Sequence, residues 1–229
     1  MVTVSDGAAH GVRTVILRLF TNNDTRITPS MNLSNVRNHT PTLASDEKQQ
    51  AAVLAPVIHC DHDPQLVFTK RAAHLGEHPG QMSFPGGAHE ATDGSLEITA
   101  WREATEEIGL QRANATLIGQ LDDIVTISNY IVRPFVSVVP DRVYDPDESE
   151  VAEVVQLPVT ALIHEENYQS VRRRKPGGHA QRLHFFSVDG YTVWGATGAM
   201  TVQLLELTTS WQAPSQPERE IGPDQDLPI

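Results

Sequence analysis

Three glutamates, Glu103, Glu106 and Glu107, lie within five residues of the chain. On a helix, spacings of three and four residues return to one face, so the three carboxylates would lie together. Like charges at these spacings destabilise a helix by about 0.2–0.5 kcal/mol per pair, and the helix dipole near the C-terminal end adds a further cost. A divalent cation would reverse both effects, and hard carboxylate oxygens suit Mg²⁺ or Mn²⁺. The alternative is a solvated acidic face on which Arg102 pairs with Glu106.

The flanking residues predict a helix that carries these glutamates. Ser95 is a good N-cap residue and Gly109 a good residue to follow the last turn, which predicts a helix over 95–108. Ile98, Trp101 and Ile108 fall on the stripe opposite the glutamates, where a core contact is expected. The preceding Gly86-Gly87 pair would let the backbone approach a metal ion or a phosphate.

The segment GGAHEATDGSLEITAWREATEEIGL (86–110) resembles the Nudix box, the signature of the Nudix hydrolases. The matching residues are Gly87, Arg102, Glu103, Ala104, Glu106, Glu107, Gly109 and Leu110. Asp93 stands where the family pattern has its first Glu, and the gap from Asp93 to Arg102 is one residue longer than in that pattern.

This resemblance implies an α/β fold, the Nudix α/β/α sandwich with a mixed β-sheet. It also implies metal-dependent hydrolysis of a nucleoside diphosphate linked to another group. Glu103 and Glu107 correspond to the first metal ligands, with Glu106 and the Gly87 carbonyl as further contributors, and Glu106 is also a candidate proton acceptor. Arg102 corresponds to a structural residue that ties the loop to the helix.

The segment LVFTKRAAHLGEHPGQMSFPGG (66–87) is similar to the signature of one Nudix subfamily, the coenzyme A pyrophosphatases. The run GYTVWGATGAM (190–200) is similar to a second element of that subfamily. The residues that this resemblance assigns to substrate binding are Arg71, His78, Gly80 and Gln81. Gly76 stands where the subfamily has an arginine, so another cation is expected to serve. The candidates are Lys70, Arg71, His78 and the cluster RRRK (172–175), whose alternative is a solvated loop.

The resemblance implies hydrolysis of coenzyme A or acyl-CoA to 3′,5′-ADP and 4′-phosphopantetheine or its acyl derivative. Two alternatives stay open: a Nudix hydrolase of another dinucleotide such as NADH or ADP-ribose, and a Nudix-like binding module without turnover. A base on a downstream loop is also common in the family, and Glu150 and Glu153 are equal candidates for it.

The elements around these motifs are mixed strands and two main helices, which predicts a sheet covered by helices on both faces. The second helix is expected over 196–209, and the expected strands are 51–59, 66–71, 115–121, 130–139, 153–158, 182–188 and 191–195. We expect an N-terminal extension and linker over 1–46, in which 12–20 could form a short helix or strand. The Nudix domain is expected over 47–210, followed by a disordered tail over 211–229.

The net charge and the cysteine content of the chain limit the classes of binding partner and the cellular compartment that we expect. The formal net charge of −12 argues against binding to nucleic acid or to an anionic membrane, but it does not exclude a small anionic ligand held through a metal. The small-molecule partner that the resemblance implies is a nucleotide substrate. The single cysteine, Cys60, and the lack of a secretory signal pattern favour a cytoplasmic protein, with a homodimer left open. The run His59-Cys60-Asp61-His62 lacks the second ligand pair of a zinc site and is expected to be a turn.

Overall fold

The computed structural model describes residues 2–3, 13–16, 18–19, 30–45, 48–60, 63–76, 78–174, 180–222 and 225–229. A nine-stranded mixed sheet forms the centre of the fold, with the strand order β2-β11-β5-β4-β10-β8. Three short strands pair beside that path: β6 with β5, β7 with β4 and β9 with β10. Strand β4 runs parallel to β10, and β11 runs parallel to β2, while the other pairs are antiparallel. The bounds are β2 Arg13–Ile16, β4 Gln49–Ile58, β5 Gln65–Arg71, β6 Met82–Ser83, β7 Gly86–Ala88, β8 Thr116–Gln120, β9 Ile124–Val125, β10 Tyr130–Val139 and β11 Val151–Pro158.

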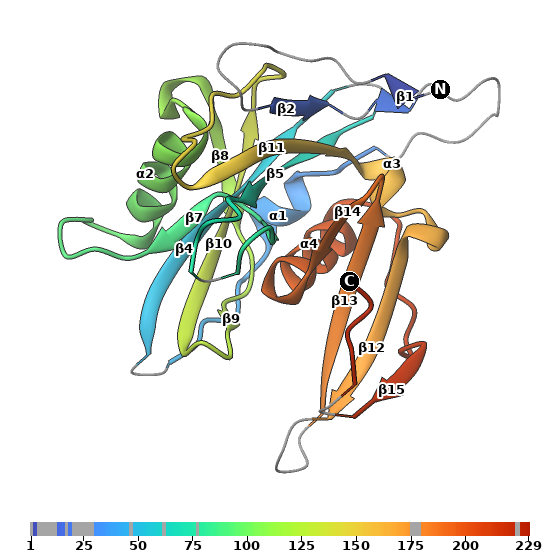
Figure 1. Cartoon of the computed structure of the whole chain (residues 1–229). Coiled ribbons are helices and arrows are strands. Elements are labelled where there is room, and N and C mark those ends of the chain that lie inside the picture. The colour runs from blue at the N-terminus through green and yellow to red at the C-terminus, as the bar shows by residue number, and fades with distance from the viewer. Residues whose placement is uncertain are drawn as a thin grey trace.

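One face of this sheet is covered by helix α2 (Leu96–Ile108), which follows the loop after β7 (Figure 1). The side chain of Ser95 accepts a hydrogen bond from the Ile98 backbone N–H, and Gly109 adopts a left-handed conformation with φ 63°, as expected for the two ends. Trp101 and Ile108 are buried against the sheet, which confirms two residues of the expected stripe. Ile98 is 43% exposed, so its expected core position is wrong, because Leu96 takes the buried place in the first turn.

Helix α4 (Gly195–Thr208) and the short α1 (Ser34–Asn38) lie on the opposite face. A second sheet lies beyond α4, in the order β14-β13-β12-β15 (Figure 1). Its bounds are β12 Tyr168–Arg174, β13 Ala180–Val188, β14 Tyr191–Trp194 and β15 Arg219–Ile221. The remaining elements are the pair β1 (Val2–Thr3) and β3 (Arg18–Leu19), the helix α3 (Val159–Leu162) and 3₁₀ turns at Arg112–Asn114 and Glu165–Asn167. The expected strands and second helix are therefore present, and two of those strands form a separate sheet.

The expected domain limits are too narrow at both ends. Within the stretch taken as linker, α1 buries Val36 in the main core. The tail over 211–229 is wrong as a disordered segment, because β15 pairs in parallel with β12 and buries Ile221. The guanidinium of Arg182 also donates hydrogen bonds to the backbone carbonyls of Pro214, Ser215 and Gln216. Each of these segments has few apolar residues, which leaves no periodic pattern to detect.

Two further expectations fall in part outside the described residues. The run 12–20 contributes β2 and β3, while Val12, Leu17 and Phe20 are not described. Asp61 and His62 are also not described, whereas Cys60 is exposed and its thiol contacts the Asp63 carbonyl at 3.1 Å. Among the described residues, no helix is long and apolar enough to cross a membrane.

Candidate active site

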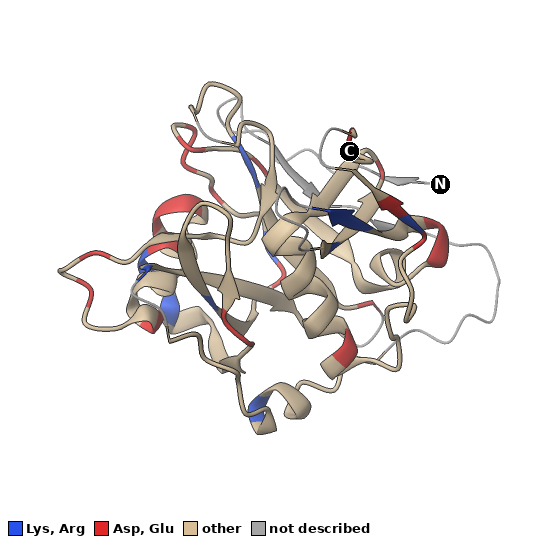
Figure 2. Cartoon of the chain, turned by 90° about the horizontal axis from the view of Figure 1, so that it is seen from below, with Lys and Arg blue, Asp and Glu red and all other residues tan. Residues whose placement is uncertain are grey.

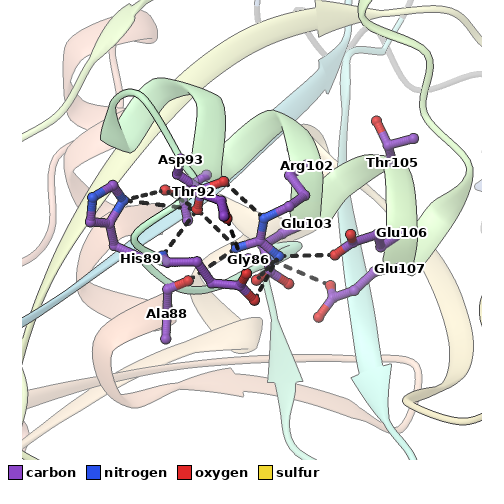
Figure 3. A network of polar contacts seen from close by, with 12 residues as sticks. Gly86, Ala88, His89, Thr92, Asp93, Arg102, Glu103, Thr105, Glu106 and Glu107 are labelled. Atoms are coloured by element: carbon purple, nitrogen blue, oxygen red, sulfur yellow. Dashed lines mark hydrogen bonds and ion pairs between the residues drawn. The ribbon is translucent and has the colours of Figure 1, made fainter.

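The three glutamates lie on the side of α2 that faces the glycine loop (Figure 3). Glu107 is only 5% exposed, and it accepts a hydrogen bond of 3.3 Å from the Gly86 backbone N–H. The carboxylate of Glu103 lies so close to Gly87 that a methyl group on Gly87 would overlap it. Glu106 is the outermost of the three, with more than half of its side chain exposed. The solvated acidic face is therefore wrong for Glu107, because the loop covers it.

Arg102 holds the loop against the helix. Its guanidinium donates to both oxygens of Asp93 at 3.0 Å and to the Ala88 carbonyl at 3.1 Å. It also donates to Glu103 at 2.8 Å and to Glu106 at 3.0 Å (Figure 3). The expected Arg102–Glu106 pair is present, but it is one contact of a wider network.

Asp93 connects the loop to Arg102 of α2, although its side chain is shorter than that of the Glu in the family pattern. It is buried, and it accepts hydrogen bonds from the Glu90 backbone N–H at 3.1 Å and the Thr99 hydroxyl at 2.9 Å. Its bonds to Arg102 hold the pKa of the Asp93 carboxyl well below its usual range. The extra residue before Arg102 is thus accommodated without loss of the ion pair.

The positive charges near the buried carboxylates Glu103 and Glu107 do not offset the effect of burial on their pKa values. Burial and, after it, the neighbouring charges of Glu103 and Glu150 together raise the pKa of Glu107 to about 8, against the lowering effects of the Gly86 N–H and Arg71. Burial also raises the pKa of Glu103, against the opposing effect of Arg102. Both carboxylates would be stabilised as anions by an additional positive charge.

These residues fit a hard divalent cation. The donor set is carboxylate oxygen plus the nearby Gly87 backbone, and the packing of Gly87 against Glu103 leaves no room for a side chain between them. Among the described residues, no three acidic, histidine or cysteine side chains already converge as a preformed site. In Figure 3, Arg102 donates to oxygens of Glu103 and Glu106.

The structure separates the two candidate bases. The loop before β11 is anchored to α2, because the Asp147 backbone N–H donates to the Glu107 carbonyl at 3.0 Å. Glu150 follows on this loop, is exposed, and raises the pKa of both Glu103 and Glu107. Glu153 instead accepts a hydrogen bond of 3.0 Å from the Tyr191 hydroxyl. Of these two candidates, Glu150 is therefore the one that acts electrostatically on Glu103 and Glu107.

The upstream segment lies beside this site. Arg71 ends β5 and acts electrostatically on Glu107. His78, Gly80 and Gln81 line a cavity of about 360 Å³. Gly76 is exposed, with open space where a Cβ would be, so this position presents no cation.

The described part of the basic cluster 172–175 lies away from the carboxylate site. Arg172 and Arg174 lie within 3.7 Å and 2.9 Å of Glu220 on the neighbouring strand β15, and Lys175 is not described. Their end of β12 lies far from α2 (Figure 1). Arg172 and Arg174 are therefore excluded as replacements for the missing arginine, and Lys70, Arg71 and His78 remain.

The far wall of the cavity is lined by Tyr191 and Trp194 of β14, which belong to the run 190–200 that is similar to the second subfamily element. That similarity marked the run, but sequence reasoning assigned neither residue to substrate binding. Over the whole sequence, acidic residues outnumber basic ones, 29 to 17, and they are distributed over several elements (Figure 2). Lys70, which lines the cavity, is therefore a basic residue in a predominantly acidic protein.

Comparison with known proteins agrees with this geometry. The family model described as the NUDIX domain matches residues 48–176. An uncharacterized Nudix hydrolase NudL from Enterobacter sp. (strain 638) is 36% identical over 169 residues, which cover 72% of this chain and 86% of the relative. A NudL protein from Photorhabdus laumondii is 33% identical over 169 residues, covering 72% and 88%.

Among solved structures, a MutT/nudix family protein from Enterococcus faecalis superposes with a TM-score of 0.51 at 11% identity, over 71% of this chain and 62% of that protein. At this identity the likeness supports the fold alone. Together with the matched family model, these relatives identify the chain as a member of the Nudix hydrolase family, enzymes that act on pyrophosphate bonds of nucleoside diphosphate derivatives.

Proposed function

We propose that this Nudix hydrolase cleaves the pyrophosphate bond of coenzyme A or acyl-CoA. The products are 3′,5′-ADP and 4′-phosphopantetheine or its acyl derivative. One observation carries the proposal: the segment similar to the coenzyme A pyrophosphatase signature spans both the carboxylate site and the cavity beside it. Its Arg71 acts on Glu107, and its His78, Gly80 and Gln81 line the cavity.

The carboxylate site provides the groups that the reaction needs. Glu103 and Glu107, with Glu106 and the Gly87 carbonyl, would hold Mg²⁺ or Mn²⁺, and the bound cation supplies neutralisation of the diphosphate charge and a site for the attacking water. Arg71 binds a non-bridging oxygen of the diphosphate as a fixed guanidinium. Arg102 and Asp93 are positioning residues that keep the loop and the glutamates in register.

The reaction is a single displacement at phosphorus. The oxygen of a water molecule forms a new P–O bond, and the bond from that phosphorus to the bridging oxygen breaks. The water proton passes to a carboxylate. Glu150 is the group we assign to this role, since it is exposed and its charge raises the pKa of both Glu103 and Glu107. Glu106, the most exposed of the three helix glutamates, is the second candidate for the proton.

The substrate is tested by a panel of compounds. Purified protein is incubated with coenzyme A, NADH or ADP-ribose, each with Mg²⁺, Mn²⁺ or EDTA, and kcat/KM is measured from separated products. We expect metal-dependent conversion of coenzyme A to 3′,5′-ADP with the highest kcat/KM. Turnover of NADH or ADP-ribose without that of coenzyme A would overturn the substrate assignment. Absence of turnover with all three would favour the binding module.

A further inference from the structure

The cavity beside the active site has two chemically different walls. The upstream segment supplies Lys70, His78 and Gln81, and β14 supplies Tyr191 and Trp194. Strand β14 follows the residues 48–176 that the family model matches. The second sheet therefore brings an aromatic wall to a cationic and polar wall, and neither wall is part of the carboxylate site.

Strand alternation connects this cavity to the carboxylate site. On β5, Leu66 and Phe68 pack in the core cluster that includes α4, while Val67 packs in the cluster under α2. The period of two places Lys70 on the α4 side and Arg71 on the α2 side. A substrate whose diphosphate lies at Arg71 could therefore reach over the end of β5 and place its remaining part in the cavity.

Lys70 is held in place while its ammonium stays available. Its Nζ lies 5.6 Å from the ring centre of Tyr191 and 3.7 Å from Glu153 Oε2, which is longer than a hydrogen bond. That same oxygen accepts the Tyr191 hydroxyl at 3.0 Å, so Tyr191 and Glu153 form a support for the lysine. The Lys70 side chain is 36% exposed, and an ammonium has three donors to offer to an anion.

We infer that this cavity is the subsite for the 3′-phosphorylated adenosine half of the substrate. Lys70 donates to the 3′-phosphate, and the aromatic wall of Tyr191 and Trp194 packs against the purine. A neutral, flexible pantetheine arm would gain little from an ammonium, whereas a phosphomonoester gains charge-assisted hydrogen bonds and a purine gains stacking contacts. This inference rests on the proposed function, because it assumes that the substrate is a coenzyme A.

Binding of the two halves tests the subsite without turnover. Titration calorimetry in EDTA compares 3′,5′-ADP, 5′-AMP and 4′-phosphopantetheine on the wild-type protein and on Lys70→Met. We expect the wild type to bind 3′,5′-ADP about tenfold more tightly than 5′-AMP. Lys70→Met removes that difference and leaves the affinity for 5′-AMP unchanged. Lys70→Arg retains most of it, and Arg37→Met, on α1, is the matched control for loss of a surface charge.

Three results would overturn the subsite: an unchanged 3′,5′-ADP preference in Lys70→Met, an equal loss for both nucleotides, or a loss confined to 4′-phosphopantetheine. Unfolding curves for each variant separate these from misfolding, and Lys70→Arg keeps the test valid if Lys70→Met fails to fold. The proposed reaction and the proposed subsite can be contradicted independently of each other. Lys70-dependent binding without coenzyme A cleavage would retain the subsite, while cleavage with Lys70-independent binding would retain only the proposed function.

Discussion

Helices α2 and α4 cover opposite faces of the central sheet and differ in how they treat buried polar groups. In α4, the buried hydroxyls of Thr201 and Thr208 donate to the carbonyls of Thr197 and Leu204, four residues earlier in the same helix. In α2, the buried carboxylate of Glu107 accepts a long hydrogen bond from Gly86 in another element, and burial raises its pKa to about 8.

This difference indicates that α4 has a packing role, whereas α2 carries groups that could do chemistry. The buried hydroxyls of Thr201 and Thr208 find their partners within α4, and α4 packs in the core between the two sheets. Among the described residues, Arg102 contacts Glu103 and Glu106, and Arg71 acts electrostatically on Glu107, yet burial still raises the pKa of Glu103 and Glu107. Buried carboxylates whose pKa values are strongly raised are typical of a functional site.

The largest expected effect is that of Glu107→Gln. We expect kcat for coenzyme A with Mg²⁺ to fall roughly a thousandfold, because a neutral amide loses the anionic ligand at the most buried position. In EDTA at pH 8, the urea midpoint of this variant should equal or exceed that of the wild type, since the costly buried charge is gone.

The matched control for this variant is Glu97→Gln, which removes a carboxylate from the first turn of the same helix, where it pairs with Arg112 at 2.8 Å. Its kcat should stay within about twofold of the wild-type value, as an exposed ion pair contributes little. A near wild-type kcat for Glu107→Gln would contradict the claim that the buried carboxylate of α2 is needed for turnover.

Two glycine substitutions should have opposite consequences. A methyl at Gly87 meets the movable carboxylate of Glu103, whereas a methyl at Gly198 of α4 would lie 2.6 Å from the backbone carbonyl oxygen of His184. We expect Gly87→Ala to lower kcat about 10- to 100-fold with little change in stability. Gly198→Ala should lower the free energy of unfolding by about 1–3 kcal/mol and leave kcat unchanged. Urea unfolding and steady-state kinetics on both variants measure this, and a common pattern in the two would contradict the distinction.

The Arg102–Asp93 tie predicts a pH effect on stability. Arg102 holds the pKa of Asp93 below its unfolded value, so this carboxylate stabilises the fold above about pH 4 and loses that effect as the pH falls below it. Thermal unfolding between pH 6 and pH 2 should therefore show a smaller loss of Tm on acidification for Asp93→Asn than for the wild type. Parallel curves would show that the ion pair does not couple the loop to α2.

The smallest expected effect concerns the helix ends. The Ser95 side chain caps α2, while the structure describes no side-chain cap at Trp194, where α4 begins. Ser95→Ala should lower the free energy of unfolding by about 1 kcal/mol in urea titrations. An unchanged free energy would mean that α2 is held by its core contacts alone, as α4 is.

Local patterns explain why helix α2 and its carboxylate face could be predicted from sequence. Ser95, Gly109 and the spacing of Glu103, Glu106 and Glu107 act within one helix, so its bounds and its charged face follow from the residues themselves. The strands over 66–71 and 130–139 carry equally local signals and are present as β5 and β10.

Long-range pairing explains what sequence reasoning could not predict. The distinction between Glu150 and Glu153 depends on the register shift of β11 against β5 near Val151, and on the hydroxyl of Tyr191 from another sheet. The parallel pairing of β15 with β12 joins residues about fifty positions apart and leaves no local pattern. The cavity is formed by such contacts, which is why sequence reasoning did not place Tyr191 and Trp194 opposite Lys70.

Identifying which bond of coenzyme A is broken tests the central claim most directly. Phosphorus NMR of coenzyme A incubated with the protein and Mg²⁺ follows the diphosphate and monoester signals in one sample. We predict that the diphosphate signals disappear, that two further monoester signals appear without inorganic phosphate, and that EDTA prevents the change. Persistent diphosphate signals with Mg²⁺ or Mn²⁺, or release of inorganic phosphate from the 3′ position, would contradict the account.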